Sequence, residues 1–354
     1  MNQKFIAFFI AFIFQFSLFA IDQPSLIFVH IGKEIPTHVQ HSIIQAREFN
    51  PDSKIYFLVS KSAVTNSTLY NQEFFHFNHI EFIDISQLKK EPVHREFDSI
   101  NSFSQRFRNG FWSHTTERFF YIYDFIKKFN IQDCVHLEND VMLYVQLEKL
   151  LPIFRTLETK IGVPMQAKTN AIPSFVYMKD HESLLHLLKH INQRILSFKE
   201  QKRHSDKKGN INSDVNDMST LASFHESNGD SALTPLPILM PEYGLNHKRR
   251  AVAYNHKNTP FSFLAKYASF FEGYLFDAVA LGVYFDGFDP RNVGRSSLPG
   301  TIHWRSLFNP SDFEYDWEVD SEGRRFPVLT YLDKKYRIIN LHFHSKRLYK
   351  FLSK

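Results

Sequence analysis

Apolar runs alternate with amphipathic segments through the first part of the chain, which is the pattern of a parallel α/β sheet. Residues 25–32, SLIFVHIG, form a short apolar run that ends in Gly, and residues 37–50, THVQHSIIQAREFN, place apolar side chains at helical spacing. A turn then opens a second apolar run at 51–60, PDSKIYFLVS. This order predicts a strand, a crossover helix and a parallel strand, and residues 80–88, IEFIDISQL, predict a third strand.

A long amphipathic helix is predicted at residues 115–130, TTERFFYIYDFIKKFN, with Thr115 or Thr116 as its N-cap. One face of this helix carries four large apolar side chains: Phe119, Ile122, Tyr123 and Ile126. The helix leads directly into residues 131–144, IQDCVHLENDVMLY, where Cys134 to Leu137 is the expected strand. Its polar continuation, residues 138–140, therefore falls at the carboxyl end of a strand, where open α/β sheets bind their ligands.

The rest of the chain continues the alternation and shows no internal repeat. The expected elements are strands at 159–166 and 173–180, helices at 182–196 and 216–224, a Pro-bracketed extended segment at 233–241, a helix within 275–292 and a strand-like end at 336–354. Residues 197–216 are polar and predict a mobile insertion. We expect one α/β domain over 22–354, with a mainly parallel central sheet flanked by helices, and with halves at 22–150 and 151–354.

Composition narrows the class of protein without identifying it. With 354 residues and 43% hydrophobic content, the chain is long enough to bury a large core. The net charge is +5, but charges of both signs are mixed along the chain, which favours a phosphate-bearing ligand slightly and does not indicate a nucleic-acid partner. Cys134 is the only cysteine, which excludes an internal disulfide framework and a thiolate zinc cluster.

The first 21 residues carry Lys4 followed by an almost uncharged apolar run, which predicts either a secretory signal or a short membrane anchor. The run is close to the lower limit of about 17 residues for spanning a bilayer. Either outcome exports the body of the protein, to a secretory-pathway lumen, the periplasm or the extracellular space, secreted or attached to the membrane.

Two pairs of residues have the spacing of metal ligands. Glu138 and Asp140 are two positions apart at a strand end and can point to one divalent cation, for which carboxylate oxygens suit Mg²⁺ or Mn²⁺. His342 and His344 have the same spacing on a predicted strand, and Lys346 follows them as a phosphate ligand. Acidic residues also end strands in ordinary turns, and a histidine pair also fits a half-exposed edge strand, so both structural interpretations stay open.

Taken in order, these pieces resemble the GT-A nucleotide-sugar glycosyltransferases over about residues 25 to 349. A helix carrying a basic residue, Arg118, runs into an acidic triplet, residues 138–140, that is similar to the DxD motif of that superfamily. Residues 342–346, HFHSK, resemble the late histidine and lysine of its glycogenin-like members. The resemblance implies a metal-dependent, hexosyltransferase-like enzyme that uses Mn²⁺ or Mg²⁺, a UDP- or GDP-sugar donor and a hydroxyl acceptor on a glycan or protein.

The resemblance also implies roles for individual residues. The implied metal ligands are Asp140 and either His342 or His344, and Glu138 meets the metal or the ribose. The implied donor-binding residues are Arg118, Lys346, Asp217 and His30. The candidate base is Asp277, with Asp286 as second choice. Two other functions fit the same residues. A metal-dependent phosphoesterase would need a denser cluster of carboxylates and histidines for two metals, and a non-catalytic exported carbohydrate-binding protein would need neither the metal site nor Asp277.

Overall fold

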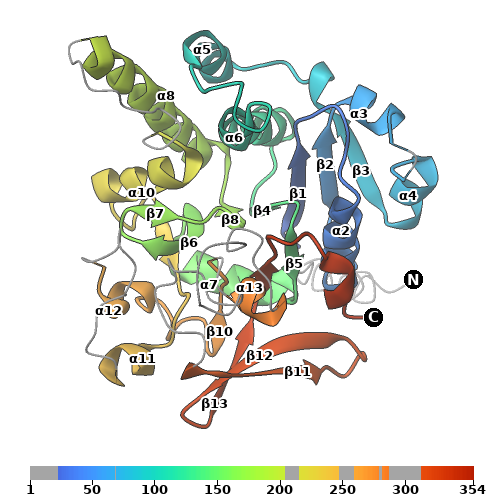
Figure 1. Ribbon diagram of the computed structural model, residues 1–354, viewed down its shortest axis with the longest axis vertical. Coiled ribbons are helices and arrows are strands. Elements are labelled where there is room, and N and C mark those ends of the chain that lie inside the picture. The colour runs from blue at the N-terminus through green and yellow to red at the C-terminus, as the bar shows by residue number, and fades with distance from the viewer. Residues whose placement is uncertain (1–22, 68, 204–214, 247–258, 279–280, 287–311) are drawn as a thin grey trace, which may run out of the picture.

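The computed structural model describes residues 23–67, 69–203, 215–246, 259–278, 281–286 and 312–354 (Figure 1). The predicted signal or anchor at 1–21 and most of the predicted insertion at 197–216 lie outside these ranges. Among the described helices, none has the length and apolar character needed to cross a bilayer.

The central sheet has eight strands, and seven of them follow the order β3-β2-β1-β4-β8-β6-β7, while β9 pairs with β6. The strands are β1 Ser25–His30, β2 Ile55–Val59, β3 Ile80–Asp84, β4 Cys134–Leu137, β6 Ile161–Ala167, β7 Asn170–Ala171, β8 Phe175–Met178 and β9 Thr234–Leu236. Strands β1 to β4 are parallel to one another, β8 is antiparallel to β4 and β6, and β9 is parallel to β6. The predicted α/β fold with a mainly parallel sheet is confirmed, including the strand at Cys134–Leu137.

Apolar side chains on both faces of β1 explain why helices cover both faces of the sheet. Leu26 and Phe28 belong to the same apolar core as α2, His38–Phe49, whereas Ile27 and Val29 belong to a second core with α6, Phe111–Phe129. Successive strand side chains point to opposite faces, so the continuous apolar run from Leu26 to Val29 is buried on both sides. Strand β1 therefore lies between the two helical layers, as Figure 1 shows for the central strands.

Helix α6 begins earlier than the sequence predicted. It starts at Phe111 after Gly110, which has φ +85°, so Thr115 and Thr116 lie inside the helix and do not cap it. Glycine suits this N-cap because L side chains rarely adopt such a positive φ. The remaining helices of the first half are α3 Lys61–Thr65, α4 Gln72–Phe77 and α5 Pro92–Ile100.

The second half contains the predicted helices with altered ends. Helix α8, His181–Arg203, is longer than expected, so residues 197–203 of the predicted insertion are helical. Helix α10, Asp217–Asn228, starts as expected, with Asn216 as its N-cap. The shorter helices are α7 Leu151–Thr156, α11 Pro241–Asn246, α12 Phe261–Leu264 and α13 Leu281–Asp286.

The last third forms two small sheets beside the central one. The first has the order β10-β13-β12-β11, from Tyr274–Leu275, Lys334–Ile338, Arg325–Tyr331 and Glu314–Val319, and it lies at the lower edge of Figure 1. In the second, β14, Asn340–His342, pairs antiparallel with β5, Val141–Leu143. The chain end predicted as one strand is therefore two strands, a turn and a 3-10 helix at Leu348–Phe351.

Candidate metal and phosphate site

The pairing of β5 with β14 brings the acidic triplet against the end of the chain. His342 is in register with Val141, and the backbone N–H of Phe343 donates to the carbonyl of Asp140 over 3.0 Å. The turn between β4 and β5 is fixed from the other side by Asn139, whose amide donates to the Val29 carbonyl over 2.9 Å. The triplet and the late histidine thus meet beside the carboxyl end of β4, where the sequence predicted a binding edge.

Glu138, Asp140 and His342 form a cluster with the composition of a divalent metal site. Each offers a ligand atom, and these atoms all lie within 4.8 Å of one another. His342 Nε2 is 3.1 Å from Asp140 Oδ2 and 3.7 Å from Glu138 Oε2. Two carboxylates and one imidazole form a donor set that divalent cations such as Mn²⁺ accept.

The Lys346 ammonium also contacts this cluster, where it donates to Asp140 Oδ2. Lys346 has φ +63°, a left-handed conformation that is uncommon for a residue with a Cβ and that turns the chain at this point. Burial lowers the pKa of Lys346 to about 8, with the Glu138 charge opposing and the Arg108 charge assisting the shift. The contact with Asp140 favours the charged form, so the lysine adds a positive charge directly beside the carboxylates.

Arg118 lies on α6 and joins Glu138 to the start of α10. Its Nη1 donates to Glu138 Oε1 over 2.6 Å, and its Nη2 donates to Asp217 Oδ2 over 2.8 Å. Burial alone would raise the pKa of Glu138, but Arg118 and His342 outweigh it and lower the pKa to about 2. Burial raises the pKa of Asp217 to about 6, against the opposing charge of Arg118. Arg118 thus orients the carboxylate of Glu138.

Basic side chains from α2 and the α5 to α6 connection lie near enough to Lys346 to interact with its charge. Burial lowers the pKa of His38 to about 4, and the nearby Lys346, His30 and His41 add to the shift. Burial also lowers the pKa of His30, which ends β1, with the backbone of Glu34 opposing. His30 is predicted from the sequence, whereas His38 and Arg108 are not; the available signal for His38 is its place at the second position of the helix predicted at 37–50.

Asp277 does not occupy the position expected of a catalytic base. Its side chain is fully buried, Oδ1 accepts from the Leu281 N–H over 2.9 Å, and Oδ2 accepts from the N–H groups of Gly282 over 2.7 Å and His342 over 3.0 Å. Three backbone donors thus occupy both carboxylate oxygens. These contacts fix α13 against β14 and so position His342, and they leave the Asp277 carboxylate buried and not open to an acceptor hydroxyl.

The same contact explains Gly282. A Cβ at this position would lie 2.3 Å from the His342 carbonyl oxygen and 2.8 Å from its nitrogen. Real Cβ atoms do not approach backbone that closely, so α13 can pack on β14 only with glycine here. Asp277 and Gly282 therefore act together on the strand that ends in His342.

Two further predicted residues lie beside the cluster. Arg347 Nη2 donates to Asp286 Oδ1 over 2.6 Å, which places Asp286 next to the turn that carries Lys346. The ring of His344 lies 4.9 Å from that of His342, but His344 does not belong to the group of three ligand atoms found among the described residues. Of the two histidines that the sequence left open, the structure places His342 at the carboxylates.

No family model and no curated protein matches the sequence. Similar solved structures include mouse xyloside xylosyltransferase 1 in its apo form, with 10% identity, 64% of this chain and 90% of that chain covered, and a TM-score of 0.43. They also include the PaToxG glycosyltransferase, with 15% identity, 58% of this chain and 70% of that chain covered, and a TM-score of 0.38. The galactosyltransferase LgtC in complex with donor and acceptor sugar analogues has 12% identity, with 68% of this chain and 83% of that chain covered, and a TM-score of 0.37.

Proposed function

We propose that this protein is a glycosyltransferase that moves a sugar from a nucleotide-sugar donor to a hydroxyl group of a glycan or protein. The observation that carries the proposal is the meeting of Glu138, Asp140 and His342 within 4.8 Å, with the Lys346 ammonium on Asp140. This combination of carboxylates, imidazole and ammonium at the carboxyl end of a parallel strand suits a divalent cation that carries a diphosphate.

The three clustered residues fit the implied Mn²⁺ or Mg²⁺, because Asp140 and His342 are largely buried, with exposed fractions of 9% and 7%, and because Asp140 already pairs with one cation, the Lys346 ammonium. When bound, the metal would offset negative charge on the departing nucleoside diphosphate. Arg118 keeps Glu138 ionised and oriented toward the other two ligands. Asp277 holds the backbone of His342 in place.

The positive groups around the cluster are suited to phosphate oxygens. Lys346, whose side chain is 43% exposed, can move from Asp140 to a phosphate, and the exposed Arg108 lies close enough to influence its charge. A diphosphate would thus exchange the ion pair within the protein for ion pairs with the ligand. Asp286 is the remaining candidate for the acceptor base, a role that we propose on its place beside Arg347.

Thermal unfolding of the full chain tests the proposal, with Mn²⁺ or Mg²⁺ added together with UDP or GDP. A ligand at about 100 times its Kd stabilises the native state by about 2.7 kcal/mol. We expect stabilisation by nucleotide only when metal is present, and its loss in Asp140→Asn. Incubation with labelled UDP- and GDP-sugars should then show slow donor hydrolysis in the absence of an acceptor.

The outcomes separate the alternatives. Release of inorganic phosphate from simple phosphate esters, without nucleotide-dependent stabilisation, would support a phosphoesterase. Stabilisation by glycans alone would indicate a non-catalytic carbohydrate-binding protein. We also propose export through residues 1–21, and measurement of the mature N-terminus and of membrane association would decide between cleavage and anchoring.

A further inference from the structure

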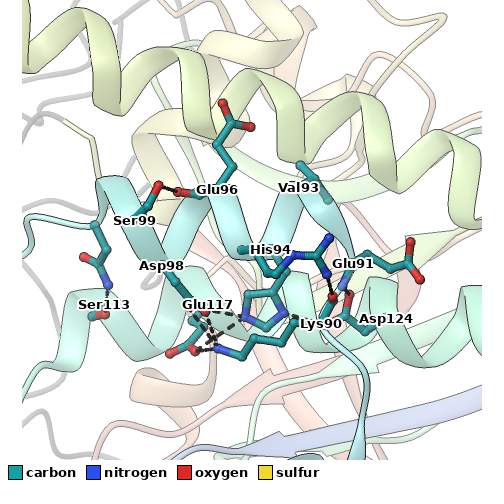
Figure 2. A network of polar contacts seen from close by, with 12 residues as sticks. Lys90, Glu91, Val93, His94, Glu96, Asp98, Ser99, Ser113, Glu117 and Asp124 are labelled. Carbon is teal, nitrogen blue, oxygen red and sulfur yellow. Dashed lines mark hydrogen bonds and ion pairs between the residues drawn. The ribbon is translucent and has the colours of Figure 1, made fainter.

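A second cluster of ionisable side chains lies between helices α5 and α6, away from the site above (Figure 2). Helix α5 contributes His94 and Asp98, four residues apart and on one helix face, while α6 contributes Glu117 and Asp124. Single ligand atoms of His94, Asp98 and Glu117 all lie within 4.8 Å of one another.

His94 is fully buried and has the environment of a metal-ligating histidine. Its Nδ1 is 2.5 Å from Asp124 Oδ2, and it donates its proton to that carboxylate. Burial acts to lower the pKa of His94, but Asp124 and then Glu117 raise it overall, so an ion bound at Nε2 competes with a proton there. His94 Nε2 is buried and has no hydrogen-bond partner among the described residues, and it points toward Asp98 and Glu117 (Figure 2). Metal-bound histidines characteristically donate their other ring N–H to a carboxylate in this way.

The distances suit a common ion. His94 Nε2 is 3.5 Å from Glu117 Oε1 and 3.9 Å from Asp98 Oδ1. Two ligand atoms that are each about 2.0 Å from a tetrahedral Zn²⁺ lie about 3.3 Å apart. The Asp98 side chain is 42% exposed and so is free to rotate, and a small rotation would bring its Oδ1 from 3.9 Å to about 3.3 Å from His94 Nε2.

A positive charge already lies between the two carboxylates. Lys90 Nζ is 2.9 Å from both oxygens of Asp98 and 3.3 Å from Glu117 Oε1. Its side chain is 29% exposed, so it has a route to solvent. One ammonium faces three carboxylates if Asp124 is included, and the group therefore has more negative charge than Lys90 neutralises.

We propose that His94, Asp98 and Glu117 bind a divalent transition-metal ion, with Zn²⁺ as its best match, and that Lys90 takes the place of the ion in the metal-free protein. Asp124 is the residue that orients His94. An imidazole with two carboxylates is a donor set that Zn²⁺ accepts, with solvent completing its coordination. The ion would join α5 to α6, the helix that carries Arg118 next to Glu117. This site is independent of the proposed transferase activity.

The test uses the full chain, purified in mild detergent without metal, in which Asp140→Asn and His342→Gln remove the first cluster. Co²⁺ is the probe, because its visible absorption reports the coordination geometry, and Zn²⁺ is then added as competitor. We expect one equivalent of Co²⁺ to give a visible band that Zn²⁺ abolishes. Asp98→Asn should weaken Zn²⁺ binding at least tenfold, and Lys90→Met should strengthen it at least tenfold.

Glu96→Gln is the matched control, because it removes one carboxylate charge from the same helix outside the cluster, and the Gln side-chain oxygen can still accept the hydrogen bond that Asn192 donates to Glu96 over 2.8 Å. It should leave Zn²⁺ affinity unchanged. If the group is only an ion-pair network, Lys90→Met will lower stability without tightening Zn²⁺ binding. That result, or the absence of a Co²⁺ band, would overturn the proposal. Far-ultraviolet circular dichroism shows whether each variant is folded.

Discussion

His342 Nε2 lies 3.1 Å from Asp140 Oδ2, although 202 positions separate the two residues in the sequence. His344, two residues later, lies outside the group of ligand atoms that includes His342. We therefore expect His342→Gln to weaken Mn²⁺ binding at least tenfold, whereas His344→Gln should change it less than about twofold. Titration calorimetry with Mn²⁺ measures both, and equal effects of the two variants would contradict the assignment.

Lys346 should have opposite effects on metal and on nucleotide. Its ammonium contacts Asp140 when no cation is bound, so Lys346→Met removes a competitor and should increase the affinity for Mn²⁺ alone. The same change removes a phosphate ligand and should lower UDP or GDP affinity about tenfold in saturating Mn²⁺. Calorimetric titrations of metal and then nucleotide test this. Lys350→Met, an exposed lysine on the following 3-10 helix, serves as the control.

Gly282→Ala should lower both the unfolding free energy and the Mn²⁺ affinity, although Gly282 is not itself a proposed metal ligand. The added Cβ would meet the backbone of His342, and such overpacking costs about 1–3 kcal/mol in unfolding free energy. The shift of β14 should also weaken Mn²⁺ binding. Gly323→Ala is the matched control, since Gly323 has φ +76° and open space around its Cβ position, so strain at Gly323 costs about 1–2 kcal/mol. Urea unfolding measures both costs, and an unchanged Mn²⁺ affinity in Gly282→Ala would disprove the coupling.

Loss of Arg118 should be among the more destabilising changes at the site. Arg118→Met leaves Glu138 and the buried Asp217 without their shared cation, and breaking a buried ion pair costs about 3–5 kcal/mol. Asp217→Asn in the same chain removes one of the unpaired charges and should restore about 1 kcal/mol or more. A double-mutant cycle by urea unfolding measures this coupling. Strictly additive effects would show that Arg118 and Asp217 do not interact in solution.

His190 should make stability depend on pH. Burial lowers the pKa of His190 to about 4, with the charge of Arg194 and then His186 adding to the shift, while its Nε2 lies 2.7 Å from Ser223 Oγ. Because the unfolded chain binds this proton near pH 6.5 and the folded chain binds it only near pH 4, unfolding free energy should fall as the pH falls through that range. His190→Gln should reduce the slope in urea unfolding at pH 7, 6 and 5. The exposed His76→Asn should not, and equal slopes in all three proteins would refute the prediction.

The sequence predicted those parts of the fold whose signal is local. The strand Cys134–Leu137 was predictable because an amphipathic helix precedes it and polar residues follow it, and the spacing of Glu138 and Asp140 indicated a shared face. The predicted start of α6 is wrong because Thr115 and Thr116 resemble N-cap residues, whereas the structure begins the helix at Phe111, after Gly110.

The remaining features of the site depend on contacts between residues far apart in the sequence. Nothing near Asp277 in the sequence shows that its carboxylate accepts from the His342 backbone, since the two are 65 positions apart. The pairing of β5 with β14 has no local signal either, so the choice between His342 and His344 needed three-dimensional information. The same holds for His94 and Glu117, which meet only because α5 packs on α6.

The pairing of β5 with β14 also orders events during synthesis. The ribosome releases Glu138 and Asp140 about 200 residues before His342 and Lys346, which at about 5–20 residues per second is a delay of tens of seconds at most. During that interval Glu138 can already pair with Arg118, whereas Asp140 lacks both His342 and Lys346. A nascent chain with a folded parallel sheet would therefore still lack one of the three proposed metal ligands, so binding of the proposed cation would report completion of the chain and not merely collapse of its first half.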